Sequence, residues 1–159
     1  MLLESLGFRP EVGRALSALG DERLQCARVM RAERGVAWVL RERPCEAGAE
    51  LAEERLVVPR RRLVGEMAPV AGDWVAFRED TGVVVRVLPR LSTFVRRKVG
   101  RAEAVQVLAA NVDEVVVVMA LDADFSVRRL SRYLALARGS GIAARVLLTK
   151  AAGLSLIHI

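Results

Sequence analysis

The sequence is poor in the residues that build disulfide frameworks and histidine-dependent sites. Among its 159 residues are two cysteines, Cys26 and Cys45, and a single histidine, His158. Two thiols are too few for a zinc site, and nothing suggests secretion, so both cysteines are expected to be free. A Ser-His-Asp triad or a histidine metal site would need a residue next to the chain end, and neither is expected.

Long apolar runs are also missing, although apolar residues make up 53% of the chain. No stretch has the length of a membrane-spanning helix, and the first residues, MLLESLGFRPE, lack the basic start and apolar core of a signal peptide. We therefore expect a cytoplasmic protein with no membrane partner. The 25 basic residues outnumber the 19 acidic ones and give a formal charge of +6, which predicts an anionic partner, with RNA preferred.

Aromatic residues are scarce, at 4% of the chain, and Trp38, Trp74 and Phe77 are expected in a core rather than stacked on bases. Two basic runs are the alternative contacts to nucleic acid. Each run is either a solvated face or a surface for phosphates, and strong salt dependence would indicate the second. The RNA-binding candidates are Arg60, Arg61, Arg62, Arg96, Arg97 and Lys98.

The first half of the chain has the pattern of a small β domain. A short helix is expected from about Pro10, and β-branched and aromatic residues between glycines then predict five short strands. The predicted strands are 24–33, 36–41, 56–64, 73–78 and 82–88, and the acidic segment 42–54 is predicted to be a solvated loop. Five strands suit an OB barrel, which binds oligonucleotides, but also an SH3-like barrel.

The second half has the pattern of a parallel βαβ unit. Residues 115–120 form an apolar, β-branched run that predicts a central strand covered on both faces. Asp122, Asp124 and Ser126 then offer loop and capping oxygens before a helix over 127–138, whose inner stripe is Leu130, Leu134 and Ala137. A second strand over 144–148 places Thr149 and Lys150 at a carboxyl end, where α/β sheets bind ligands.

The order of QVLAANVD, an apolar strand, LDADF, RRL, RYL and LLTK resembles the ribosome small-subunit-dependent GTPase A family, a circularly permuted family. The resemblance implies an N-terminal OB domain and then a GTPase domain that opens with the guanine-reading motif (N/T)KxD. In this chain Thr149 and Lys150 match the motif, but Ala152 stands in place of its Asp. A methyl group cannot accept the two hydrogen bonds of guanine, so guanine selectivity is not expected.

The family resemblance also implies GTP and Mg²⁺ as cofactors, a structural zinc in a C-terminal domain, and the small ribosomal subunit and its RNA as partners. The phosphate-binding motif G-x-x-x-x-G-K-[ST] is absent from the 159 residues. The family is a GTPase, whereas this chain is expected to be a truncated, inactive part with no catalytic residue, metal site or cofactor of its own. Asn111 is expected to bind backbone, and Asp122 and Asp124 to cap a loop rather than bind magnesium.

The predicted organisation is an arm over 1–22, an OB-fold RNA-binding domain over 23–90, a linker over 91–107, the first part of the GTPase domain over 108–150 and an atypical tail over 151–159. The OB barrel is thus followed by the incomplete βαβ start of an α/β P-loop-type GTPase domain. A monomer is expected. The alternative is a stand-alone basic OB module that binds RNA without nucleotide chemistry.

Overall fold

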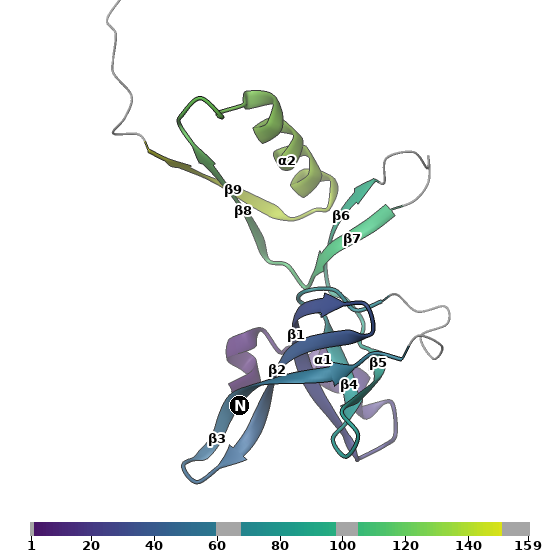
Figure 1. Ribbon diagram of the computed structural model, residues 1–159. Coiled ribbons are helices and arrows are strands. Elements are labelled where there is room, and N and C mark those ends of the chain that lie inside the picture. The colour runs from purple at the N-terminus through teal and green to yellow at the C-terminus, as the bar shows by residue number, and fades with distance from the viewer. Residues whose placement is uncertain (1, 60–67, 98–104, 151–159) are drawn as a thin grey trace, which may run out of the picture. The chain divides into compact units, whose positions relative to one another are not determined.

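The computed structural model describes residues 2–59, 68–97 and 105–150 (Figure 1). The chain divides into two compact units, and each is described by itself. The first comprises Met1–Leu91 and Leu108–Asn111, and the second comprises Ser92–Val107 and Val112–Ile159.

Five strands of the first unit close a barrel in the order β1-β2-β3-β5-β4. All neighbouring pairs are antiparallel except β3 with β5. Alternating side chains fill the interior, where Val29, Val39, Leu56 and Phe77 are at most 1% exposed. The strands are β1 (Leu24–Glu33), β2 (Val36–Cys45), β3 (Gly48–Val57), β4 (Trp74–Arg78) and β5 (Val83–Val87).

A short N-terminal arm packs on a second apolar cluster of this unit. The arm consists of η1 (Leu2–Leu6) and α1 (Pro10–Ser17), so the helix predicted from Pro10 is confirmed. Val12 is buried beside Trp74, and the ring of Phe8 meets that of Trp74 edge to face at 5.1 Å between centroids. Trp74 and Phe77 are fully buried as predicted, whereas Trp38 is half-buried under the Arg31 guanidinium.

The loop predicted over 42–54 is wrong, because β2 and β3 continue through it as a hairpin (Figure 1). Their register runs without interruption from Val36↔Val57 to Cys45↔Gly48. The acidic residues that argued against a strand are accommodated by cross-strand ion pairs, since Glu54 accepts from Arg41 and, at 3.2 Å, from Arg43. The strand predicted over 56–64 ends at Val57 instead, and residues 60–64 lie outside the described residues.

Residues 108–111 are fastened to the barrel by hydrogen bonds. The Ala110 amide donates to the Ala71 carbonyl, the Asn111 amide side chain donates to the Gly72 carbonyl, and its oxygen accepts from the Leu91 amide, each at 2.9 Å. The prediction that Asn111 binds backbone is confirmed. Gly72, at φ +85°, permits the close approach, because a Cβ there would lie 2.1 Å from the Ala110 oxygen.

A buried ion pair supports the same region. Asp73 is fully buried and accepts from two nitrogens of Arg90 at 2.7 Å each and from the Val70 amide at 2.7 Å. This two-pronged geometry satisfies both carboxylate oxygens, as a buried charge requires. The pair holds the turn before β4 against the segment after β5.

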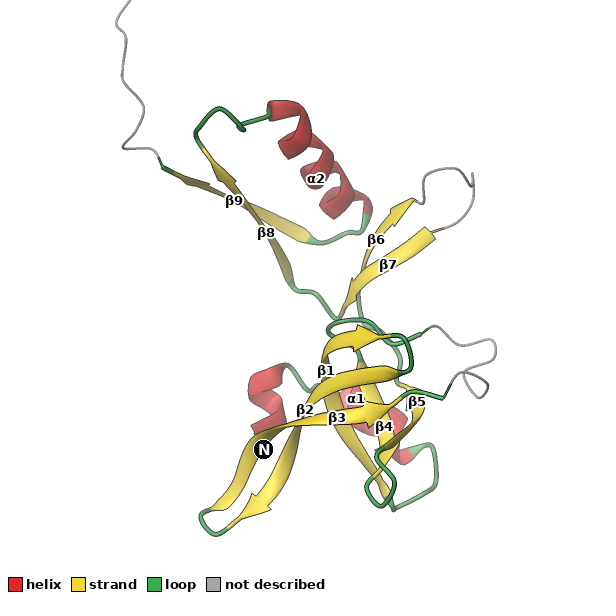
Figure 2. Ribbon diagram, viewed as in Figure 1, coloured by secondary structure: helices red, strands yellow, loops and turns green. Residues whose placement is uncertain are grey.

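The second unit contains one α-helix, the two strands joined by it, and β6 with the first half of β7. Strands β6 (Thr93–Arg97) and β7 (Val105–Ala110) pair mainly within the region predicted to be a linker, and residues 108–110 of β7 belong to the first unit. Strands β8 (Glu114–Ala120) and β9 (Ala143–Thr149) pair in parallel, and α2 (Val127–Gly139) connects them and contacts both strands (Figure 2). The βαβ prediction is confirmed.

The prediction that residues 115–120 form a central strand covered on both faces is wrong for the described residues. There β8 pairs only with β9, and α2 covers one face. Val116, Val118 and Leu147 are consequently 49%, 59% and 52% exposed.

Among the described residues, no helix is long and apolar enough to span a membrane.

Candidate functional site

Thr149 and Lys150 lie where the two parallel strands end together. The register runs from Glu114↔Ala143 to Ala120↔Thr149, so the carboxyl ends of β8 and β9 meet at one edge. The Leu121 amide donates to the Thr149 carbonyl at 2.9 Å, which extends the pairing by one residue. Lys150 then turns out of the strand with φ +60°, a left-handed conformation that is uncommon for a lysine.

The Lys150 ammonium is held by a carboxylate from the loop after β8. Its Nζ donates to Oδ2 of Asp122 at 2.7 Å, while Oδ1 of Asp122 accepts from the Asp124 amide at 3.0 Å. The hydrogen bond from Lys150, followed by that from the Asp124 amide, lowers the pKa of Asp122. The sequence predicts the role of Asp122 as a loop cap, and the structure confirms it. The ion pair with Lys150 was not predicted, because its partners are 28 residues apart.

The start of α2 completes this edge of the sheet. The Ser126 hydroxyl accepts from the Arg129 amide at 3.3 Å, so the predicted N-cap is confirmed. The Arg129 guanidinium also donates to the Asp124 carbonyl. The loop 121–126 is therefore fixed at both ends, by Lys150 and by the first turn of the helix.

Thr149 and Lys150 are the two residues that the sequence predicts to contact a guanine base. Thr149 and Lys150 stand at a strand's carboxyl end, the position expected for a base-reading motif. Ala152 lies outside the described residues, and its side chain has no acceptor for the guanine edge. The motif G-x-x-x-x-G-K-[ST], which forms the phosphate-binding loop, does not occur in these 159 residues.

The carboxylate of Asp122 is engaged with protein groups. Asp122 holds Lys150 and the Asp124 amide, in keeping with the predicted capping role. Among the described residues, no group of three or more His, Cys, Asp or Glu side chains is placed to hold a metal ion. Both cysteines are free, as predicted, and burial raises the pKa of Cys26 to about 12, which makes it a poor nucleophile.

The predicted RNA contacts lie mostly beyond what the structure describes. Arg60, Arg61, Arg62 and Lys98 lie outside the described residues, as does the side chain of Arg97 at the end of β6. Arg96 is exposed on β6 and donates twice to Oε1 of Gln106 on β7, at 3.1 Å each. An RNA-binding role for these residues remains a prediction.

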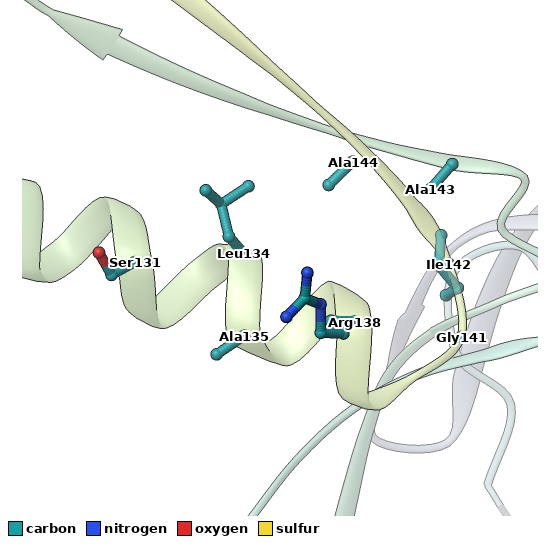
Figure 3. Close-up of a pocket in the computed structure, with 8 residues that line it drawn as sticks. All are labelled: Ser131, Leu134, Ala135, Arg138, Gly141, Ile142, Ala143 and Ala144. Atoms are coloured by element: carbon teal, nitrogen blue, oxygen red, sulfur yellow. The ribbon is translucent and has the colours of Figure 1, made fainter.

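Two hollows accompany these elements, one in each unit. Figure 3 shows the cavity of about 730 Å³ beside α2, where Leu134 and Arg138 face the small side chains of Ala143 and Ala144. In the first unit, a cavity of about 610 Å³ lies between the arm and the β2–β3 hairpin, with Phe8, Leu16 and Pro44 in its lining. Thr149 and Lys150 line neither cavity, so neither cavity adjoins the base contact that the sequence predicts.

Comparison with known proteins bears directly on the βαβ unit. Residues 87–155 match the RsgA GTPase family. A protein of Opitutus terrae named small ribosomal subunit biogenesis GTPase RsgA is 48% identical over 94 residues, which are 52% of this chain and 26% of that protein. Proteins of the same name from Leptospira interrogans and Xanthomonas campestris are 44% identical over 86 residues and 41% identical over 92 residues.

The matched segments cover 51% and 58% of this chain and 24% and 25% of those two relatives. The chain therefore spans about a quarter of the length of the curated relatives it matches. The match includes the paired strands β8 and β9, the helix between them and the Thr149–Lys150 dipeptide. The resemblance stated from the sequence is confirmed for residues 87–155, which are similar to the RsgA GTPase family.

Proposed function

We propose that this chain is the N-terminal part of a GTPase that binds the small ribosomal subunit and acts in its late maturation. The observation that carries the proposal is the placement of Thr149 and Lys150 at the carboxyl ends of two parallel strands, within a segment up to 48% identical to proteins named small ribosomal subunit biogenesis GTPase. GTP hydrolysis, with Mg²⁺, and a structural zinc then belong to the longer protein. The expected location is the cytoplasm.

We also propose that the barrel is an OB fold and serves to bind ribosomal RNA. The strand order supports this, because β1 pairs with both β2 and β4, and β3 closes the barrel against β5 in parallel. The net charge of +6 favours contact with the RNA backbone. Arg60 to Arg62 and Arg96 to Lys98 are the candidate contacts, and a monomer is the expected state.

The chain itself is expected to bind guanine nucleotides weakly or not at all. The sequence has no phosphate cradle, and Ala152 cannot distinguish guanine from adenine. Calorimetry with GTP, GDP and ATP should compare three proteins: this chain, its Ala152→Asp variant, and the variant extended with the downstream part of a relative. Only the extended protein should bind GTP and GDP selectively, and micromolar guanine-selective binding by the chain as it stands would contradict the proposal.

The ribosomal assignment is tested by co-sedimentation with purified small and large subunits. We expect binding to the small subunit that weakens as salt rises, because the contacts are to phosphates. Replacing Arg96, Arg97 and Lys98 with Ala should flatten that salt dependence. Equal binding to both subunits would contradict the ribosomal assignment. An unchanged salt dependence would show that these three residues do not contact the RNA.

A further inference from the structure

The outer face of α2 carries positive charge without any acidic residue. Arg128, Arg129 and Arg132 are exposed in the first two turns of the helix, and no Asp or Glu occurs between residues 125 and 144. The opposite stripe, with Leu130, Leu134 and the buried Ala137, faces inward and fixes how the helix is turned. At 100° per residue, the three arginines fall on one arc of the outward face. We call them the α2 arginine cluster.

The stability of the helix does not explain this cluster. Arg128 and Arg129 lie in the first turn, which contains no acidic residue, and cations there oppose the helix dipole. Arg128 and Arg132 are also one turn apart, where like charges repel. Both placements act against the helix, so they indicate an interaction with a group outside it.

Several exposed arginines outside the cluster have acidic partners, although Arg34, Arg55 and Arg138, like the cluster, form no ion pair among the described residues. Within the described ranges, Arg14, Arg23 and Arg145 each form an ion pair, with Glu11, Asp21 and Glu114 at 3.2, 2.9 and 3.2 Å. In the same ranges Arg128 and Arg132 form no ion pair, and the contact recorded for Arg129 is with the neutral Asp124 carbonyl. Their charge is therefore available to an incoming anion.

The surroundings of the cluster indicate which anion it fits. Along the same face, Ala135 and Gly139 are small and exposed, so a ligand can approach the helix closely. Beside the arginines, Leu136 is half-buried and Tyr133 is 41% exposed, but two single side chains do not make the continuous apolar face that anchors a helix in a membrane. Guanidinium groups spaced by about one helical turn instead suit the repeated phosphates of a nucleic acid strand.

We propose that the α2 arginine cluster is a second RNA-binding surface, formed by residues other than the basic runs 60–62 and 96–98. It binds the phosphate backbone of double-helical RNA. The choice of RNA over other polyanions rests on the proposed ribosomal function. The presence of an anion-binding surface on α2 rests on the helix alone.

The test measures the affinity of the whole chain for a labelled double-helical RNA of arbitrary sequence between about 50 and 200 mM salt. In the double variant Arg128→Gln and Arg132→Gln, the slope of log affinity against log salt should become shallower by about 1.5, because two phosphate contacts are lost. The matched control, Arg138→Gln with Arg145→Gln, removes the same charge from the same unit and should change the slope by less than half as much. Arg129 is left in place because it holds the Asp124 carbonyl.

A conservative variant keeps the test decisive if glutamine alters the fold. Arg128→Lys with Arg132→Lys preserves the charges and should retain most of the slope. Equal slopes in the cluster and control variants would overturn the proposal, because net charge alone would then govern binding. Tighter binding to polyglutamate or to anionic phosphatidylserine vesicles than to RNA, with the same sensitivity to the cluster, would also overturn it.

The ribosomal assignment can fail independently of this surface. The same variants should be tested with purified small subunits in parallel. If the chain does not bind the subunits but the RNA slopes still differ between cluster and control variants, the α2 surface stands and the proposed ribosomal function fails. If neither measurement separates the two variants, the α2 surface itself is wrong.

Discussion

The outward-facing valine of a barrel strand is less exposed than that of a strand in the βαβ unit. In β5, Val84 is 1% and Val85 is 41% exposed, whereas in β8 Val117 is 7% and Val118 is 59% exposed. In the barrel each strand pairs on both sides, and the interior is closed by side chains from all five. Within the described residues β8 and β9 pair only with each other. The stability of an apolar strand thus depends on the strands and helices packed against it, and the composition of the strand does not reveal them.

One ion pair from each unit gives a second contrast. The Asp73–Arg90 pair of the first unit is buried, with side chains 0% and 5% exposed. The Asp122–Lys150 pair of the second unit has side chains 33% and 67% exposed. Solvent screens the second pair, so the two pairs should differ greatly in their effect on stability.

The largest expected effect comes from breaking the buried pair. Asp73→Ala leaves the Arg90 charge and the Val70 amide without their partner, which should lower the free energy of unfolding by about 3 to 5 kcal/mol. Urea unfolding followed by tryptophan fluorescence reports this, because both tryptophans, Trp38 and Trp74, lie in the barrel unit. The control Asp21→Ala removes the pairs of Asp21 with Arg23 and Arg78, which solvent screens, and should lower the stability far less. Equal losses in the two variants would refute the contrast.

Hydrogen exchange should separate the two units in the unaltered chain. Amides of β1 and β4, which lie inside a closed barrel, should be protected at least about tenfold more than those of β8, a difference of about 1.4 kcal/mol in local opening. The reason is that opening β8 breaks pairing with a single neighbour among the described strands. Equal protection in both units would show that the βαβ unit is as stable as the barrel.

Matched valine substitutions sharpen the comparison at single positions. Val84→Thr places a hydroxyl in the barrel core and should destabilise by about 1 to 3 kcal/mol. Val118→Thr changes an exposed side chain and should stay within about 0.5 kcal/mol while reducing aggregation. Thermal unfolding and light scattering measure the two effects. A large loss of stability for Val118→Thr would mean that this face of β8 is covered in solution.

The smallest effect concerns pH and the exposed pair. Because Lys150 lowers the pKa of Asp122 in the folded state, the contribution of Asp122 is present above its ordinary value of 3.8 and is lost as the pH falls through the lower folded value. NMR titration of the Asp122 carboxyl carbon should give a midpoint below 3.8, and Lys150→Gln should move it back toward that value. A midpoint unchanged by Lys150→Gln would exclude the ion pair in solution.

Several elements of the fold could be predicted from residue patterns, because the interactions that form them are between residues close in the sequence. Pro10 starts α1 and Ser126 caps α2, since both act on the first turn of their own helix. The β-branched run before Asp122 indicated a strand, and the LLTK segment contributed to the family resemblance, whereas a base contact by Thr149 and Lys150 stays a prediction. The hairpin over 42–54 was missed because its glutamates are stabilised by arginines on the facing strand, and a pattern read along one strand does not include that partner.

By itself, the sequence determined the resemblance to the GTPase family, the βαβ order of the second half, and the presence of Ala152 where the family motif has Asp, because these depend only on which residues are present and in what order. Tertiary structure alone decided that Asn111 and Gly72 fasten residues 108–111 to the barrel and that Asp122 holds Lys150. It also decided which apolar strands are buried. These outcomes depend on contacts between residues far apart in the chain, whose geometry is set by strand pairing and closure.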